Sequence, residues 1–461
     1  MKGSLRSQGN LLPQEIHEAV ELMSHAVVFG EADERTRAQL TRCLDAEAGA
    51  WGVLCADNHL GYAMPVGGVV GYRHHVSPNG VGYDIACGNC AVRTNLVARD
   101  VDVRRVMDEI WKVIAFGLGR LNTERIDDHP VFDAIARSPV REQRAMLQMA
   151  RNQLGTVGSG NHYVDLFEDR ADGALWVGVH FGSRGFGYKT CSGFLALAAG
   201  KEWGARVDDS MDAPPTLIAL DTPLGQDYWA AMEIAGAYAY AGRDWVIDRV
   251  VRLLGAEPTD RVHNHHNFAW KETHGGETLI VVRKGATPAQ PGQRGFIGGS
   301  MGDDAVIVEG VDHPESAKAL YSTVHGAGRV LSRRQARGKT KIVRKWRCAN
   351  YRNCDFAGAA GGFRRGPNNE TPRCPKCGHK LHLEPVEQQL VAGAVDWPSW
   401  QARLAAQGIE LRGGGADEAP ECYKRLPDVL AAHGPTIRVL HRLRVIGVAM
   451  AGAGIVDPFK D

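Results

Sequence analysis

The stretch Gly80-Val-Gly-Tyr-Asp84-Ile-Ala-Cys87-Gly88 places a carboxylate and a thiol three residues apart on a glycine-flanked loop. On a tight turn, side chains at this spacing reach the same point in space, so Asp84 and Cys87 are candidates to bind one metal ion. A thiolate can also bridge two cations, and Cys87 is then the ligand that two metal ions share.

Four more short stretches place histidine, asparagine or arginine next to glycine or next to one another. They read Gly158-Ser-Gly-Asn161-His162, Val179-His180-Phe-Gly-Ser-Arg184-Gly185, His263-Asn-His265-His266-Asn267 and His325-Gly-Ala-Gly-Arg329. A single histidine of this kind is more often structural than a ligand. Together with Asp84 and Cys87, the set predicts a metal site with oxygen, nitrogen and sulfur ligands. Two divalent ions there would keep a charge of about +2, which attracts a triphosphate or an RNA terminal phosphate.

The composition is that of a folded protein without a membrane span. The chain has 461 residues, of which 44% are hydrophobic and 23% are charged, with a formal net charge of +1. This length and composition exclude a disordered chain and a disulfide-stapled miniprotein. The longest nearly apolar stretch, Val445–Val456, has 12 residues, whereas a membrane helix needs about 20. Met1–Leu12 lacks the apolar segment of a secretion signal, so we expect a soluble, cytoplasmic protein without membrane contact.

Hydrophobic spacing predicts an α+β chain that begins with helices. In residues 1–48 the apolar positions recur at helical spacing, which predicts an N-terminal helical segment of two packed helices. Further helices are expected over Val103–Leu121, Val131–Leu154 and Tyr228–Leu254. Short buried strands are expected at Leu175–Val179, Thr278–Val282 and Ala305–Val308. A cysteine-rich segment, residues 346–384, interrupts this pattern as an inserted module.

The inserted segment contains four of the ten cysteines of the chain, namely Cys348, Cys354, Cys374 and Cys377. In a cytosolic chain such cysteines are more often metal ligands than disulfides. The two pairs resemble a zinc ribbon, and we expect a structural Zn²⁺ ion there. The first pair is spaced more widely than is usual in structural zinc sites. Two alternatives therefore stay open: His379 or His382 replaces one sulfur, or the four thiols are unrelated.

Nine basic residues and no acidic residue lie between Arg329 and Arg347. Such a segment suits the phosphate backbone of a nucleic acid, although a solvated basic linker explains the charge equally well. Trp346, Tyr351 and Phe356 are available for base stacking. A zinc-stapled knob on this basic stem would clamp RNA near the metal site. The alternative is a rigid surface insertion that only packs.

Nine separated motifs of the chain occur in the same order in a known family. They are PVGGVV, GVGYDIACG, GTVGSGNHYVD, VHFGSRGFG, HNHHN, VRKGAT, GGSMG, TVHGAGRVLSR and DEAPECYK. By these motifs the chain resembles the RtcB-type RNA ligases, also called tRNA-splicing ligases. The resemblance runs from about residue 50 to 345 and from about 388 to the end. It implies a single α+β domain, residues 49–345 and 385–461, into which the zinc-ribbon-like module is inserted.

The resemblance also implies a chemistry and its cofactors. Members of this family use GTP and two Mn²⁺ ions to join RNA that ends in a 2',3'-cyclic phosphate or 3'-phosphate to RNA with a 5'-hydroxyl. One ion would be held by Cys87, His180 and His266, and the other by Asp84, Cys87 and His162. His325 would be the catalytic nucleophile, which becomes guanylylated before GMP passes to the RNA.

Further roles carry over by position in the family motifs. The residues that would contact phosphates of GTP or RNA are Asn161, Arg184, Lys284 and Arg329. The residues that would contact guanine are Asp165, Ser300, Tyr423 and Lys460. Asp165 stands where the family often has glutamate, and the chain does not end in the usual lysine and glycine, so Lys460 is aligned loosely. Cys90 is another departure, and it is expected to place a second thiol near the metals.

Two other functions would use the same residues. A metal-dependent RNA-end phosphoesterase would need the metals without guanylylation of His325, and a zinc-ribbon RNA-binding protein would need only the cysteine module. The complete ligand and nucleophile motifs favour the ligase. The resemblance further implies RNA and GTP as partners, a monomer, and a role in RNA repair or tRNA splicing. It is also compatible with an activating protein partner.

Overall fold

The computed structural model describes residues 20–452, except positions 24, 118, 125, 208–209, 351–353, 355, 360–361 and 365–369. The chain forms two compact units. The main unit comprises the chain up to Val330 and from Trp397 onward, and the inserted unit is Leu331–Asp396. Each unit has a buried core of its own.

A six-stranded sheet forms one half of the main unit. In the order β1-β2-β3-β4-β12-β11, its strands are Val20–Met23, Ala26–Phe29, Trp51–His59, Val66–Tyr72, Glu277–Lys284 and Asn267–His274. Neighbouring strands are antiparallel except β2 and β3, which run parallel. Helix α1 (Glu34–Asp45) makes the crossover that a parallel connection requires.

An eight-stranded sheet forms the other half. Its path is β10-β6-β8-β7-β21-β15-β14, and β20 pairs with β21. In that order the strands are Pro258–His265, Gly88–Val97, Ala174–Phe181, Tyr163–Asp169, Ile437–Gly452, Ala305–Gly310, Arg294–Ile297 and, for β20, Glu410–Gly414. All eight residues of β8 are buried, which is typical of a strand covered on both faces.

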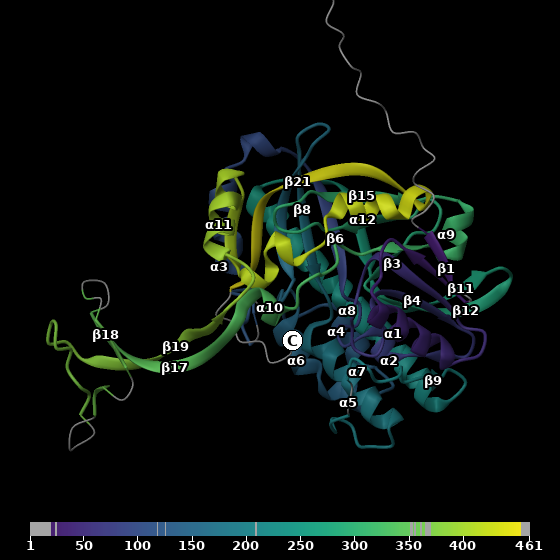
Figure 1. The fold of residues 1–461 in the computed structure, drawn as a ribbon, viewed down its shortest axis with the longest axis horizontal. Coiled ribbons are helices and arrows are strands. Elements are labelled where there is room, and N and C mark those ends of the chain that lie inside the picture. Colours follow the sequence, from purple (N-terminus) through teal and green to yellow (C-terminus); the bar gives the residue numbers. More distant parts are fainter. Residues whose placement is uncertain are drawn as a thin grey trace, which may run out of the picture. The chain divides into compact units, whose positions relative to one another are not determined.

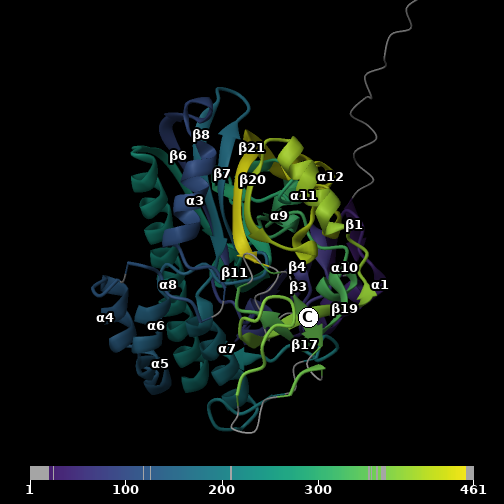
Figure 2. The ribbon, with the colours of Figure 1, turned by 90° about the vertical axis from the view of Figure 1, so that its left-hand side faces the viewer.

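Helices cover one face of the eight-stranded sheet. Figure 2 shows α3 (Val103–Val113) and α8 (Pro223–Leu254) beside β6, β8 and β7. Their shared core contains Met107, Ile110, Val177, Val179 and Val250. The other face of the sheet buries Ala91, Phe167, Trp176, Phe296 and Val448. A separate core joins β15 to the six-stranded sheet through Val53, Val281, Val306 and Val308.

Helix α8 has 32 residues and clear signals at both ends. Thr222 accepts the N–H of Gly225, Pro223 suits the first turn, and Gly255 ends the helix in the left-handed conformation. The expected helix over Tyr228–Leu254 is therefore confirmed, and it begins at Pro223. Arg243 lies on its buried side. Among the helices that the structure describes, including this one, none is both long and apolar enough to cross a bilayer.

Three expected strands are confirmed as β8, β12 and β15, whereas two expected helices are shorter than predicted. The first is α3, which ends at Val113 ahead of the left-handed residues Gly117 and Gly119. The second is divided into α4 (Pro130–Ala136), α5 (Arg141–Ala145) and α6 (Leu147–Gln153). Pro139 explains the first division, because it disfavours a helical conformation at the preceding residue.

In the described residues, the prediction of two N-terminal helices is wrong for the first helix, whereas α1 (Glu34–Asp45) is helical as expected. Positions 20–23 and 26–29 are strands β1 and β2, and only α1 is helical. All four residues of Ala26–Phe29 are buried, and β2 pairs with β3. A helix would turn part of this apolar run toward solvent, whereas a strand between two neighbours buries all of it. Residues 1–19 lie outside the described residues.

The inserted unit is built on a long two-stranded ribbon, visible in Figure 1. Strand β17 (Gly338–Cys348) pairs with β19 (Leu381–Ala392) from one end to the other, and β18 (Ala357–Ala359) pairs with β17. Helix α10 (Arg333–Arg337) precedes the ribbon. The predicted module, residues 346–384, is therefore too short. The basic segment Arg329–Arg347 is not a linker. Arg333–Arg337 form α10 and the residues from Gly338 onward form β17, both in this unit, whereas Arg329 belongs to the main unit.

Gly178 lies in β8, where two phenylalanine rings leave no room for a side chain. A Cβ there would lie 2.7 Å from Phe167 Cε2 and 2.9 Å from Phe296 Cε1. We expect Gly178→Ala to destabilise the main unit by about 1–3 kcal/mol, because the rings must move. Thermal unfolding followed by circular dichroism measures this as a lower midpoint. Gly452→Ala is the control, since within the described residues, its chain neighbours aside, no heavy atom lies within 4 Å of its added carbon. Equal midpoints for the two variants would contradict the packing argument.

Candidate metal centre

The loop between α2 (Pro78–Val81) and β6 folds into a tight turn that brings Asp84 and Cys87 together. Cys87 N donates to Asp84 O at 3.0 Å, and Ala86 N donates to Asn267 O at 2.7 Å. Ala86 has a φ of 60°, which costs a residue with a Cβ about 1 kcal/mol or more. The next position but one, Gly88, requires glycine, because a Cβ there would lie 2.2 Å from Asn264 O. The neighbouring strands therefore determine the shape of the loop.

Five side chains from four segments, Cys87 among them, converge on one point. Asp84 and Cys87 lie on the loop, His162 directly before β7, His180 on β8, and His266 between β10 and β11. The ligand atoms of Cys87, His180 and His266 lie within 4.8 Å of one another, as do those of Asp84, Cys87 and His162. Cys87 Sγ lies 3.2 Å from His180 Nε2 and 3.6 Å from His162 Nε2. The structure thus brings the five predicted ligands together, and Cys87 belongs to both groups.

Several of these atoms are acceptors that face one another. His162 Nδ1 lies 2.9 Å from Val157 O, so in the neutral ring this nitrogen carries the proton and Nε2 has a lone pair. That lone pair faces Asp84 Oδ2 at 3.1 Å. Among the described residues, Asp84 Oδ2 and His266 Nδ1 are buried without a hydrogen-bond partner. A divalent transition metal would satisfy these oxygen, nitrogen and sulfur donors, so the residues fit a metal centre.

Burial sets the protonation of the ligands when no metal is bound. It lowers the pKa values of His180 and His266 well below 6.5, so both rings are neutral. It raises the pKa of Cys87 well above 9.0, so the thiol keeps its proton. A metal must displace the Cys87 proton, and its binding therefore strengthens as the pH rises.

His325 lies beside the ligands and is held by a buried carboxylate. Its ring centroid is 4.8 Å from that of His266. Asp57 Oδ2 accepts from His325 Nδ1 at 2.6 Å, from the backbone N of His325 at 2.9 Å and from Gly326 N at 3.3 Å. Burial acts to raise the pKa of Asp57, but the charge and hydrogen bonds of His325 outweigh it and lower this pKa. The paired carboxylate leaves His325 Nε2 as the nitrogen with the lone pair.

The sequence analysis did not identify Asp57. The available signal was an acidic residue near the end of a largely apolar stretch, Trp51–His59. Its partner His325 is distant in the sequence, so only the packing of β3 against the loop after β16 (Ser322–Val324) reveals the pair.

The predicted phosphate contacts have different surroundings. Arg184 begins α7 (Arg184–Ala198) and lies so close to Gly158 that a Cβ there would be 1.9 Å from its Nη1. Asn161 is half-buried and directly precedes His162. Both residues therefore lie next to candidate ligands. Lys284 donates instead to Tyr62 O at 2.5 Å and to Asn79 O at 3.0 Å.

The structure joins Arg329 to Tyr423, which the sequence analysis assigned to phosphate and to guanine. Arg329 donates to Tyr423 Oη at 2.9 Å and to Asp417 O at 2.7 Å, and Tyr423 donates to Glu418. Glu418 was missed, although it lies within the motif DEAPECYK. This acid is buried, so the group is a network inside the protein.

The remaining predicted guanine contacts do not share this network in the described residues. Ser300 Oγ donates to Asp303 Oδ2 at 3.2 Å. Asp165 is buried on β7, and burial raises its pKa well above 3.8. Lys460 lies outside the described residues.

Cys90 does not point toward the candidate ligands, which corrects the expectation of a second thiol there. In β6 the Asn89 side chain donates to Phe296 O at 2.8 Å. Successive side chains of a strand point to opposite faces, so Cys90 points the other way. Its sulfur lies near Asp244 and His263 instead.

In the inserted unit, the four predicted zinc cysteines converge, with ligand atoms within 4.8 Å of one another. The Sγ atoms of Cys348 and Cys377 are 3.3 Å apart, and those of Cys354 and Cys374 are 3.7 Å apart. These separations exceed the roughly 2.05 Å of a disulfide. Burial opposes ionisation of Cys374, but the N–H groups of Lys376 and Cys377 lower its pKa to about 7. This arrangement suits a structural zinc ion without a histidine ligand.

Comparison with known proteins places these residues in a family. The family model described as tRNA-splicing ligase RtcB matches residues 47–138 and 134–351. This chain belongs to the RtcB family. The matched RtcB region contains Asp57, His325 and all five candidate metal ligands, whereas Tyr423 and Glu418 lie beyond it.

Curated relatives agree with the family assignment. The tRNA-splicing ligase RtcB of Archaeoglobus fulgidus is 31% identical over 359 residues, which cover 62% of this chain and 74% of the relative. The RNA-splicing ligase RtcB of Escherichia coli K12 is 31% identical over 324 residues, covering 65% and 78% of the two chains. The RNA-splicing ligase RtcB of Mycobacterium bovis is 31% identical over 353 residues, covering 61% and 80%.

Cys87→Ala should bind neither metal ion tightly, because both ligand groups include its sulfur. His162→Ala and His180→Ala should each weaken one ion only, since each removes a ligand from a single group. Titration with Mn²⁺ by calorimetry counts the bound ions. Cys90→Ala is the matched control, because it removes a buried thiol on the other sheet face, and it should bind as the unaltered chain does. Two tightly bound ions in Cys87→Ala would contradict the shared ligand.

Proposed function

We propose that this chain is a GTP- and Mn²⁺-dependent RNA ligase that acts through guanylylated His325. It would join 2',3'-cyclic phosphate or 3'-phosphate ends of RNA to 5'-hydroxyl ends, in RNA repair or tRNA splicing. Family membership and the names of the curated relatives support an RNA ligase. The observation that carries the mechanism is the position of His325, bonded to buried Asp57 and beside His266.

Asp57 prepares His325 for nucleophilic attack. Because Nδ1 is bonded to the carboxylate, Nε2 carries the lone pair and attacks the α-phosphorus of GTP. The N–P bond forms while the bond from the α-phosphorus to the bridging oxygen breaks, and pyrophosphate leaves. The imidazole gains positive charge in this step, and the Asp57 carboxylate stabilises it without taking the proton.

Neighbouring residues hold the phosphates during the reaction. When bound, the two metal ions supply Lewis-acid stabilisation of the charge that develops on phosphoryl oxygens. Arg184 and Asn161 contact phosphate oxygens, since both lie beside candidate ligands and a guanidinium pairs well with phosphate. Lys284 acts indirectly, because its ammonium holds Tyr62 O and Asn79 O, and Asn79 belongs to the helix before Asp84.

The stored GMP then passes to RNA. An oxygen of the RNA 3'-phosphate attacks the phosphorus, the P–N bond breaks, and Nε2 of His325 regains its lone pair. The 5'-hydroxyl attacks the activated 3'-phosphate, the phosphodiester forms, and GMP leaves. A cyclic phosphate is first opened by water to the 3'-phosphate at the same site.

For guanine we propose contacts from Asp165, Ser300, Tyr423 and Lys460. A carboxylate matches the two adjacent N–H donors on the Watson–Crick edge of guanine. Burial raises the pKa of Asp165 well above 3.8, and so works against the ionised carboxylate that would accept both donors.

The inserted unit would bind Zn²⁺ through its four cysteines and contact RNA along β17. Lys339, Lys341, Arg344 and Arg347 are exposed on this strand, and their charges suit a phosphate backbone. We propose that the ligase works as a monomer in the cytoplasm.

Labelling with α-labelled GTP and Mn²⁺, followed by denaturing electrophoresis, tests the nucleophile. The unaltered chain should carry label, and His325→Ala and Cys87→Ala should carry none. Asp57→Asn should slow labelling by about 100-fold or more, because the ring tautomer is no longer fixed. His74→Ala, which removes an exposed histidine of the main unit, should label normally.

An unlabelled chain that is folded and loaded with Mn²⁺ would rule out the His325 mechanism. If that chain still opened cyclic phosphates, the phosphoesterase alternative would replace the ligase.

Cys374→Ser should lose the zinc of the inserted unit and weaken RNA binding, yet still be guanylylated, because the main unit has its own core. Three measurements separate these effects: zinc content by mass spectrometry, RNA binding by filter retention, and guanylylation by labelling with GTP. Cys43→Ser alters a buried thiol of the main unit and should keep its zinc. Unchanged zinc content in Cys374→Ser would contradict the four-sulfur site.

A further inference from the structure

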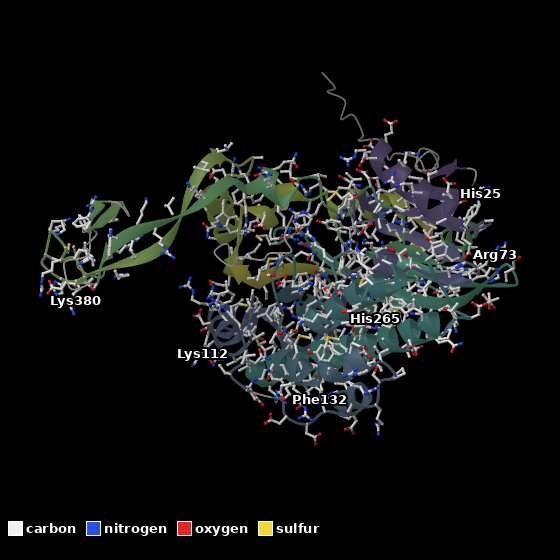
Figure 3. All side chains as sticks on the ribbon, turned by 90° about the horizontal axis from the view of Figure 1, so that it is seen from below. His25, Arg73, Lys112, Phe132, His265 and Lys380 are labelled. Atoms are coloured by element: carbon white, nitrogen blue, oxygen red, sulfur yellow. The ribbon has the colours of Figure 1, made fainter. Side chains whose placement is uncertain are left out.

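Arg243 is a fully buried arginine on α8 that bonds to several segments of the candidate metal centre. Its Nη1 donates to Ala86 O at 2.9 Å and to Phe181 O at 2.6 Å. Its Nη2 donates to His265 Nδ1 at 2.9 Å, and its Nε donates to His263 Nε2 at 2.8 Å. One side chain therefore links the loop before β6, the end of β8 and the end of β10. Figure 3 shows His265 within the interior of the main unit.

Three of these acceptors directly adjoin candidate ligands. Ala86 precedes Cys87, Phe181 follows His180, and His265 precedes His266. We propose that Arg243 is the positioning residue of the metal centre, which fixes Cys87, His180 and His266 relative to one another by holding their sequence neighbours. This inference rests on the proposed metal-dependent function.

The conformation of Ala86 indicates why such a support is needed. Its φ of 60° is unfavourable for a residue with a Cβ and persists only where the surroundings hold it. Two hydrogen bonds hold the backbone of Ala86. Ala86 N donates to Asn267 O at 2.7 Å, and Arg243 Nη1 donates to Ala86 O at 2.9 Å. Loss of the second bond frees the turn to relax and so moves the Cys87 sulfur.

The tautomer of His263 allows its Nε2 to accept a hydrogen bond from Arg243. Its Nδ1 lies 3.4 Å from Asp244 Oδ1, which favours the proton on Nδ1 and leaves the lone pair of Nε2 for Arg243. Burial lowers the pKa of His263 to about 4, so the ring is neutral. With two carbonyls and two imidazoles as acceptors, the buried guanidinium has the partners that its charge requires.

This network also accounts for the cluster of Cys90, Asp244 and His263, whose ligand atoms lie within 4.8 Å of one another. His263 Nε2 is bonded to Arg243, and Asp244 forms an ion pair with Arg261. Two arginines at this position repel a cation. We therefore assign Asp244 and His263 to the support of Arg243 and not to a third metal ion.

The charge of Arg243 opposes the binding of a cation nearby, so its contribution to metal affinity must come from geometry. Lysine keeps the charge but lacks the planar fork that reaches several acceptors at once. Arg243→Lys therefore separates the effect of ligand geometry on Mn²⁺ affinity from the effect of the positive charge.

The experiment is calorimetric titration of the full chain with Mn²⁺ alone, after the cysteine site has been loaded with zinc, together with the electron paramagnetic resonance spectrum of bound Mn²⁺. Arg243→Lys should bind Mn²⁺ about 10- to 100-fold more weakly than the unaltered chain, with a changed spectrum. Arg283→Lys is the matched control. Arg283, on β12, is also fully buried, but it pairs with Glu272 on β11. Its replacement should therefore lower stability and leave the Mn²⁺ affinity within about twofold of that of the unaltered chain.

If Arg243→Lys does not fold, two variants of His263 test the same inference. His263→Leu removes the acceptor for Arg243 Nε and should weaken Mn²⁺ binding, whereas His263→Gln retains an acceptor and should restore it.

Equal Mn²⁺ binding by the unaltered chain and by folded Arg243→Lys would overturn this inference alone. Without a folded lysine variant, unweakened binding by His263→Leu would do the same. An unaltered chain that binds no Mn²⁺ would overturn the proposed function as well.

Discussion

The candidate site depends on the register of the eight-stranded sheet around β6. His266 N donates to Cys87 O at 2.8 Å, Asn89 pairs with His180, and Gly88 pairs with His265. These pairings fix where the thiol and the imidazoles stand along their strands. A shift of one residue in the β6–β8 ladder would turn His180 to the opposite face of the sheet. The candidate metal centre thus depends on backbone pairing, which sets where its ligands lie along their strands.

The proposed nucleophile, His325, and its partner Asp57 come from other elements than the candidate ligands. Asp57 lies on β3 of the six-stranded sheet, and His325 follows β16, which pairs with β13 (Ala286–Pro288). Only the packing between the two halves of the main unit brings this pair beside His266. The chemistry that we propose therefore requires the whole main unit, since neither sheet alone contains both the ligands and the nucleophile.

The sequence predicted residues that lie in compact motifs better than residues that act across the fold. Asp84 and Cys87 could be paired from their spacing, and family motifs supplied the three histidines and His325. Asp57 and Arg243 were missed because their partners are distant in the chain and neither has a distinctive local pattern. Glu418 was missed although it lies within a family motif, five residues before its partner Tyr423. The first of the two N-terminal helices was predicted wrongly because four consecutive apolar residues, Ala26–Phe29, fit the inside of a sheet as well as a helix face, and only tertiary pairing decides between them.

The burial of Cys87 has a further consequence for the durability of the protein. The thiolate, not the thiol, is the form that oxidants attack, and burial raises the pKa of Cys87 well above 9.0. The sulfur that both ligand groups share is therefore less reactive toward oxidants while it carries its proton. In the metal-free chain the protonated thiol is protected from oxidants, and metal binding converts it into the anionic thiolate.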